Sequence, residues 1–321
     1  MKLGLFLAMF PDKSLKEVLD TIRPLGLQTV EIGAGNYPGA PHINVDELLE
    51  SKPKRDELLA TLKGEGLEIS AISCHGNCLH PDDAFAKANQ EVQTKAIKLS
   101  SLLEIGVVND FSGCPGSDPG AAKPCWVTCA WPPDYLEILD WQWNEKVIPY
   151  WTKQAKFAAE HGVKIGFEMH PGFVVYNTET MLKIREACGK TLGANFDPSH
   201  LWWQGMDPLA SIRELGGECL HHVHAKDALV QAFNSDINGV LDTKHYGEEI
   251  KRSWLFRSVG YGHGLDWWCD FASTLRMVGY DGPVSIEHED SLMTPFEGLS
   301  KAVEVLKQSL IFQERGAITW A

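Results

Sequence analysis

Charged and imidazole side chains follow four apolar runs in the second half of the sequence, at the point where each run ends. The four stretches are Phe167-Glu168-Met169-His170-Pro171, Asn195-Phe196-Asp197-Pro198-Ser199-His200, His222-Val223-His224-Ala225-Lys226-Asp227 and Ile286-Glu287-His288-Glu289-Asp290. Glu168 and Asp197 are 29 residues apart, and Asp197 and His224 are 27 residues apart, which is about one strand–helix unit. His224 and Glu287 are 63 residues apart, which is one unit plus an insertion of roughly 35 residues. One carboxylate or imidazole therefore recurs at the same phase in four consecutive units.

These four residues have the types that bind a divalent metal ion. In a barrel, residues at the same phase of neighbouring strands point at one spot above the carboxyl ends of the strands. Three carboxylates and one imidazole held there would repel and desolvate one another without a cation. The sequence therefore predicts one divalent metal ion bound by Glu168, Asp197, His224 and Glu287. Three oxygen donors and one nitrogen donor favour Mn²⁺, with Mg²⁺, Co²⁺ and Zn²⁺ as alternatives.

The elements that must position these residues are short apolar runs alternating with longer amphipathic stretches. The runs are apolar nearly throughout, as expected for strands buried on both faces. The predicted strands are Leu3–Leu7, Thr29–Ile32, Leu67–Ser73, Gly106–Phe111, Val163–Glu168, Leu192–Phe196, Leu220–His224 and Val284–Glu287. The predicted helices are Leu15–Leu25, Lys54–Gly64, Asp83–Glu104, Asp134–His161, Thr178–Cys188, Asp207–Leu215, Asp266–Val278 and Pro295–Leu310.

Local signals mark several helix ends. Ser14 and Glu17 have the spacing of a capping box at the start of the first helix. A glycine closes five of the helices just before the next strand, which is the usual chemistry of a helix-to-strand loop. These glycines are Gly26, Gly66, Gly106, Gly162 and Gly279.

Eight strand–helix units predict a (β/α)8 TIM barrel, which we interpret as a single domain over residues 1–321. The alternative is a doubly wound open sheet, but that fold usually has a phosphate-binding loop, and none follows the first strand. Two long loops, Ser112–Pro133 after the fourth strand and Ala228–Leu265 after the seventh, are expected over the carboxyl ends of the strands. Barrel enzymes have their active sites at this end.

Composition excludes several classes of protein. A net charge of −14 argues against a nucleic-acid-binding protein, which needs a basic surface. No apolar run approaches the roughly 20 residues of a membrane span. The eight cysteines include no Cys-x-x-Cys pair and form no disulfide framework, which predicts reduced thiols and a cytoplasmic protein. The apolar start could also be a weak signal peptide, but no A-x-A-like cleavage site follows it.

The metal-ligand pattern resembles the sugar phosphate isomerase/epimerase family, the xylose isomerase-like TIM barrels. The similarity covers nearly the whole chain and is strongest from Gly162 to Asp290. The family's Glu, Asp, His and Glu ligands correspond here to Glu168, Asp197, His224 and Glu287. Its Asp-Pro-x-His element is present as Asp197-Pro198-Ser199-His200, and its His-x-Lys-Asp element as His224-Ala225-Lys226-Asp227.

The resemblance implies a metal-dependent sugar isomerase or epimerase. Its mechanism would be proton abstraction next to a metal-bound carbonyl, through an enediolate. Glu168 and Glu287 are expected to act as acid and base, with His200 orienting a hydroxyl group. The expected substrate contacts are His75, Asn77, His170, Lys226, Asp227 and His263. The partner would be a small sugar.

The sequence departs from the ketose 3-epimerases of this family in two places. They have an arginine six residues after the histidine of the seventh strand, where this chain has Val230, and the loop that follows is much longer here. These differences speak against a plain free-ketose epimerase. Apurinic endonucleases share the fold, but they need more histidine ligands and a cationic DNA-binding face.

Two further functions remain open. A lyase or dehydratase would eliminate a β-leaving group from a keto-sugar, a 3-keto-glycoside or an inosose, and the long loops would supply room for that group. A non-catalytic subunit would bind metal and sugar without turnover. The tail 311–321, which contains Trp320, is predicted to contact another copy of the chain or a second subunit.

Overall fold

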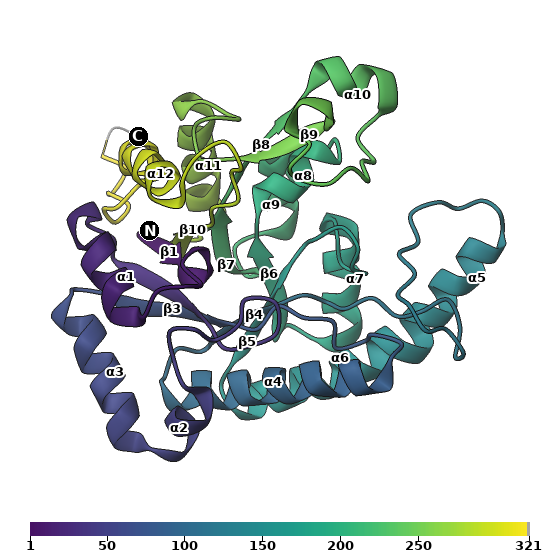
Figure 1. The fold of residues 1–321 in the computed structure, drawn as a ribbon, viewed down its shortest axis with the longest axis horizontal. Helices are drawn as coiled ribbons and strands as arrows, with labels where there is room; N and C mark the ends of the chain where they lie inside the picture. The colour runs from purple at the N-terminus through teal and green to yellow at the C-terminus, as the bar shows by residue number, and fades with distance from the viewer. Residues whose placement is uncertain (320–321) are drawn as a thin grey trace.

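The computed structural model describes residues 1–319 and contains a closed barrel of eight parallel strands (Figure 1). Its strands are β1 (Lys2–Phe6), β2 (Thr29–Gly33), β3 (Glu68–Ser73), β4 (Val107–Asp110), β5 (Lys164–Glu168), β6 (Leu192–Phe196), β7 (Leu220–Ala225) and β10 (Pro283–Ile286). They are hydrogen-bonded in chain order, and β10 closes the ring between β7 and β1. The predicted (β/α)8 barrel is confirmed, and each predicted strand ends within one residue of the observed one.

Helices surround the strands. They are α1 (Leu15–Ile22), α2 (Val45–Glu50), α3 (Lys52–Gly64), α4 (Asp83–Leu102), α5 (Asp134–Trp141), α6 (Ile148–Glu160), α7 (Thr178–Cys188), α8 (Pro198–Trp203), α9 (Pro208–Leu215), α10 (Ala232–Asn238), α11 (Leu265–Met277) and α12 (Pro295–Ser309). The single helix predicted over Asp134–His161 is divided into α5 and α6 by a π-helical segment at Gln142–Val147. The short helices α2, α8 and α10 were not predicted, because six or seven residues are too few for a helical period to show.

The predicted capping box and closing glycines are confirmed, although α1 ends three residues and α4 two residues before the predicted ends. Ser14 caps α1 in a reciprocal capping box with Glu17. The five closing glycines all have left-handed backbone angles, with φ between 64° and 89°. Only glycine adopts these angles without steric cost, so each of these glycines turns the chain toward the next strand.

Polar side chains fill the part of the barrel interior nearest the strands' carboxyl ends. Asn109, Asn195 and His222 are all fully buried there. A glycine makes room for them, because a Cβ atom at Gly166 would lie 2.8 Å from Asn109 Oδ1. The outer faces of the strands pack against the helices in one large apolar core. The strands are therefore buried on both faces, which is why their sequences read as continuous apolar runs.

The two long excursions follow β4 and β7. After β4, residues 111–133 contain neither helix nor strand. The segment predicted as a loop over Ala228–Leu265 instead contains β8 (Asp227–Val230) and β9 (Trp254–Arg257), paired antiparallel, with α10 between them. The sequence gives no hairpin signal there, because β8 and β9 are separated by a long segment rather than by a tight turn. Figure 1 shows the β8–β9 sheet and α10 projecting from one side of the barrel and α5 from another.

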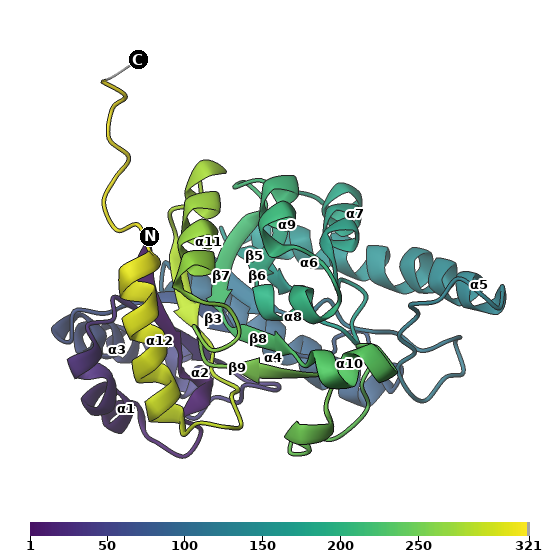
Figure 2. The ribbon, with the colours of Figure 1, turned by 90° about the horizontal axis from the view of Figure 1, so that it is seen from above.

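Beyond α12 the chain leaves the body of the barrel (Figure 2). Residues 312–319 are exposed and have no regular secondary structure, and Trp320 lies outside the described residues. The predicted contact of this tail with a partner stays a prediction. Among the described residues, we find no helix with the length and apolar character needed to span a membrane.

Candidate metal centre

The four predicted metal ligands lie together at the carboxyl end of the barrel. Glu168 is the last residue of β5, Asp197 follows β6, His224 lies near the end of β7, and Glu287 follows β10. One potential ligand atom from each residue lies within 4.8 Å of those from the other three. We call this group the carboxylate–histidine quartet. Glu168, Asp197 and His224 are buried, and the Glu287 side chain is only 15% exposed.

Asp197 is oriented by the helix that follows it. It is the N-cap of α8, and its Oδ1 atom accepts a hydrogen bond of 2.8 Å from the Ser199 backbone N–H. The buried Oδ2 atom faces the Lys226 ammonium, 3.0 Å away. Burial raises the pKa of Asp197 to about 7. A buried carboxylate oxygen needs a positively charged or donor partner, so this atom is suited to a bound cation.

Glu168 is held between two imidazoles. His200, one turn along α8, donates from Nε2 to Glu168 Oε1 at 2.9 Å, and His75 Nε2 lies 3.1 Å from Oε2. Burial alone would raise the pKa of Glu168, but the Lys226 ammonium and these two imidazoles outweigh it and hold the pKa well below its usual value. Glu168 is therefore an ionised carboxylate with a fixed orientation. His200 itself is neutral, since burial lowers its pKa to about 3.

His224 connects the quartet to a buried glutamate that the sequence analysis missed. Its Nε2 atom lies 2.8 Å from Glu31 Oε2, on β2. Its Nδ1 atom lies 3.0 Å from Glu287 Oε2 and 3.6 Å from Glu168 Oε2. A histidine ligand usually donates its second ring N–H to a carboxylate, which fixes the tautomer and aims the other nitrogen at the metal. Glu31 has the position to accept the N–H of His224 Nε2, which leaves Nδ1 facing Glu287 and Glu168.

Glu31 is completely buried, and both of its oxygens have partners. The Ser73 hydroxyl and the Asn109 amide donate to Oε1, the latter at 2.9 Å. A signal was present in the sequence, because Glu31 interrupts the apolar run Thr29–Ile32. A charged residue inside a strand that is buried on both faces needs a partner. That signal did not identify His224, which is 193 residues further along the chain.

Lys226 places a positive charge against the quartet. Its buried ammonium lies 3.0 Å from Asp197 Oδ2, 2.9 Å from Glu287 Oε2 and 4.0 Å from Glu168 Oε1. Three members of the quartet thus already share one cation, the Lys226 ammonium. A fourth partner of the ammonium, the half-exposed Glu289, lies 3.0 Å away. The donors present therefore fit a divalent cation.

The other predicted substrate-binding residues fall into two groups. His75, His170 and Lys226 lie at the quartet, with the His170 ring 4.1 Å from the His200 ring. Asn77 instead joins two loops, because its amide bonds the backbone of Leu79 and Cys114.

Asp227 likewise organises the backbone. It accepts hydrogen bonds from the N–H groups of Ala228, Gly260, Gly262 and His263, and from the His263 ring at 2.8 Å. The His263 ring also stacks on Trp202 at 3.8 Å between ring centres. The structure does not bring Asn77, Asp227 or His263 into contact with the quartet. Sequence position alone could not show that their polar groups are already hydrogen-bonded or stacked within the loops.

Comparisons with known proteins agree with this architecture. A family model described as a xylose isomerase-like TIM barrel matches residues 19–309. The chain is 40% identical over 298 residues to the uncharacterized protein YfiH of Bacillus subtilis (strain 168), which covers 92% of this chain and 95% of that protein.

Three solved structures are similar in fold. A D-tagatose 3-epimerase-like protein is 22% identical with a TM-score of 0.64, covering 96% of this chain and 97% of that one. The probable 3-DHS dehydratase AsbF from Bacillus anthracis is 17% identical with a TM-score of 0.65, covering 96% and 99%. The IOLI protein with a bound zinc atom is 17% identical with a TM-score of 0.64, covering 96% and 98%. At these identities the structures support the fold alone, whereas the family model covers most of the sequence. The chain belongs to the family of xylose isomerase-like TIM barrels.

Proposed function

We propose that this protein is a divalent-metal-dependent enzyme that transfers a proton at the carbon next to a sugar carbonyl, as an isomerase or epimerase. The observation that carries the proposal is the convergence of Glu168, Asp197, His224 and Glu287 at the carboxyl end of the barrel. The D-tagatose 3-epimerase-like neighbour has the same fold and supports this class of reaction.

The quartet would hold the metal ion, for which we propose Mn²⁺, with Mg²⁺, Co²⁺ and Zn²⁺ as alternatives. When bound, a divalent cation supplies Lewis-acid polarisation of a carbonyl oxygen, which makes the neighbouring C–H group more acidic. The zinc atom in the IOLI protein supports a metal ion in this fold.

Glu168 is our candidate for the general base. His75 and His200 hold it ionised and fixed, and a carboxylate has about four acceptor sites, so two remain for a ligand and a proton. Glu287 approaches from β10, on the other side of His224, and is our candidate for the group that returns the proton. His200 would orient a substrate hydroxyl group.

A lyase is the second candidate. A cavity of about 280 Å³ adjoins the quartet at His200 and provides room for a leaving group. His170 lines this cavity, and because its Nδ1–H donates to the Pro171 carbonyl oxygen, its free Nε2 can accept a hydrogen bond from a hydroxyl leaving group. Elimination of water or of a sugar substituent would then follow the same proton abstraction. The dehydratase AsbF, of similar fold, supports this candidate.

Proton NMR of the Mn²⁺-loaded protein in D₂O distinguishes these functions. The panel contains free ketoses, inososes and 3-keto-glucosides, and each reaction is stopped with a chelator. Deuterium entering an otherwise intact sugar beside its carbonyl supports the isomerase or epimerase. A new C=C signal with release of water or of an aglycone supports the lyase. No exchange with any substrate, although metal is bound, contradicts both and favours a metal- and sugar-binding subunit.

A further inference from the structure

A cavity with aromatic walls lies beside the quartet, and the isomerase or epimerase reaction proposed above does not use it. Its volume is about 280 Å³. Three separate segments supply the aromatic side chains: the excursion after β4, helix α8, and the excursion that contains β9. These side chains are Trp126, Trp203, Tyr246, Trp254 and Phe256. We call this space the aromatic cavity.

The walls of the aromatic cavity are held in place by their own contacts. Trp203 and Trp254 stack in parallel, with ring centres 4.6 Å apart. The buried Arg252 guanidinium lies 4.3 Å from the Tyr246 ring and 4.6 Å from the Trp254 ring. Arg252 is fixed in turn by its hydrogen bonds to the backbone carbonyls of Trp254 and Lys244. A preformed aromatic wall binds a flat group without an ordering cost.

The aromatic cavity offers few polar partners. The Asp242 carboxylate is already bonded to two groups of Lys244 and to the Ser253 backbone N–H. The indole N–H groups of Trp126 and Trp203 have no acceptor among the described residues. A second sugar ring, with its several hydroxyl groups, would leave most of them unpaired. A flat apolar group with one or two acceptor oxygens fits better.

The aromatic cavity lies next to the quartet and is separated from it by residues that contact both. His200 lines it and is 2.9 Å from Glu168 Oε1. Phe256 lines it as well, with its ring 4.7 Å from Lys226 Nζ. A second cavity, also of about 280 Å³, shares Phe256 and Tyr246 and reaches Glu289, the partner of Lys226. One ligand can therefore contact the charged residues and the aromatic wall together.

We propose that the substrate is a sugar that carries an aromatic substituent of one or two fused rings. Its polyhydroxylated carbonyl part would lie at the quartet and its ring system in the aromatic cavity. A cavity of about 280 Å³ is nearly twice the roughly 150 Å³ that accommodates benzene in an engineered protein. This inference rests on the proposed function, because the quartet must be the site of the carbonyl part.

The test compares two glucosides in calorimetric titrations of the Mn²⁺-loaded full chain. 2-Naphthyl β-D-glucopyranoside carries the ring system, and methyl β-D-glucopyranoside does not. We expect the naphthyl compound to bind at least about tenfold more tightly, since a stacked aromatic group adds apolar burial and ring contacts. Trp126→Ala and Tyr246→Ala should each reduce this preference to about threefold or less.

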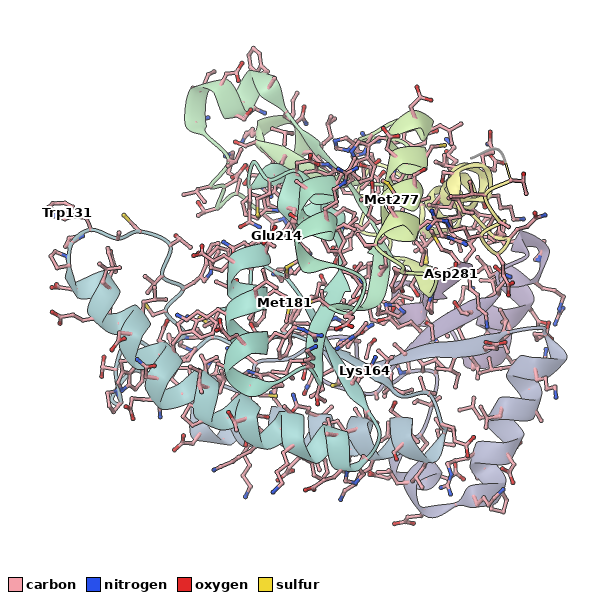
Figure 3. All side chains as sticks on the ribbon, turned by 180° about the vertical axis from the view of Figure 1, so that it is seen from behind. Trp131, Lys164, Met181, Glu214, Met277 and Asp281 are labelled. Carbon is pink, nitrogen blue, oxygen red and sulfur yellow. The ribbon has the colours of Figure 1, made fainter. Side chains whose placement is uncertain are left out.

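Trp131→Ala is the matched control. Trp131 lies in the same excursion as Trp126, but its side chain is 74% exposed and stands at the outer edge of the molecule beside α5 (Figure 3). It should leave the preference unchanged. Equal affinity of the two glucosides for the wild type, or an undiminished preference in both cavity variants, overturns the inference.

Mn²⁺ titration separates this result from a failure of the proposed function. Bound Mn²⁺ with no preference for the naphthyl compound overturns the substrate inference alone. Absence of Mn²⁺ binding overturns the proposed function, and a naphthyl preference lost in the Trp126 and Tyr246 variants would then still support an aromatic-binding cavity.

Discussion

Two groups of buried charges lie close together in this barrel: Glu31 with its partners, which we call the deeper group, and the quartet. They differ in how completely their charges are matched. In the deeper group, Glu31 has partners on both oxygens: Ser73, Asn109 and His224. In the quartet at the mouth, three carboxylates converge on one ammonium, that of Lys226, which lies 3.0 Å from Asp197 Oδ2. Each oxygen of Glu31 therefore has its own partner, whereas the three carboxylates of the quartet share one positive charge. A group of buried charges points to function when its members are not all matched by partners of their own.

His224 belongs to both groups, with one ring nitrogen in each. Nε2 faces Glu31 and Nδ1 faces Glu287. Burial would lower the pKa of His224, but the carboxylates of Glu31 and Glu287 outweigh it and raise the pKa well above its usual value. Glu31, in the deeper group, thereby orients His224, which is a member of the quartet. Variants that affect one group at a time should separate these roles.

The largest effect is expected at the quartet itself. Glu168→Gln keeps an oxygen that can bind metal but removes the proposed base, so turnover should fall by about 10²–10⁴-fold. The measurement is the rate of deuterium exchange in the substrate identified by NMR. Glu186→Gln, the same change at an exposed position on α7, is the control and should keep the full rate. A Glu168→Gln protein that binds metal and retains full turnover would contradict the assigned role.

In the deeper group, Glu31→Gln should weaken metal binding without changing any metal ligand. Loss of the carboxylate on His224 removes the contact that fixes the ring, and such changes typically cost about 10–100-fold in metal affinity. Calorimetric titration with Mn²⁺ measures the loss. Ser73→Ala is the matched variant, because it removes a hydrogen bond to Oε1 and keeps the His224 contact at Oε2. Equal losses in the two variants would show that Glu31 acts only through packing.

A Lys226 variant tests whether the ammonium already neutralises the carboxylates of the quartet and so weakens metal binding. The ammonium competes with a divalent cation for Asp197 and Glu287. Lys226→Met should therefore raise the affinity for Mn²⁺, by about tenfold if one close like charge is worth about 1.4 kcal/mol. The same titration measures it. A variant that binds Mn²⁺ less tightly would mean that Lys226 supports the metal site instead of competing with it.

The last predicted effect concerns folding stability and arises at Asp110, a buried carboxylate outside both groups. It accepts hydrogen bonds from Gln93 and from the backbone of Gly76 and Phe111. Burial nevertheless raises its pKa from 3.8 to about 7. Between these pH values the folded protein keeps a proton that the unfolded chain has lost. This group's contribution to stability is therefore present below about pH 4 and is lost as the pH rises toward 7.

Asp110→Asn removes that titration. The stability of the wild type minus that of the variant should decrease from pH 5 to pH 7, by at most about 1.4 kcal/mol per pH unit. Urea unfolding at several pH values measures the difference. A difference that stays constant over this range would mean that Asp110 is ionised in the folded protein.

The sequence was sufficient to predict the barrel and the quartet for one physical reason. Strands buried on both faces are apolar throughout, and parallel strands end at the same side, so residues at matching strand ends meet. Side-chain partners across the barrel could not be predicted, because the contact of Glu31 with His224 depends on closure of the whole ring. The loop role of Asp227 depends on backbone N–H groups at Gly260 and Gly262, which only the folded excursion brings near.

The central claim is that the quartet binds one divalent cation, and Mn²⁺ titration of the chelator-treated full chain tests it most directly. We predict one site per chain, with the affinity reduced at least about 100-fold by Asp197→Asn, which removes the charge of one proposed ligand. Asp207→Asn is the control, because Asp207 caps α9 as Asp197 caps α8 but lies outside the quartet. No Mn²⁺ binding by the wild type, or equal binding by the Asp197 variant, would contradict the account.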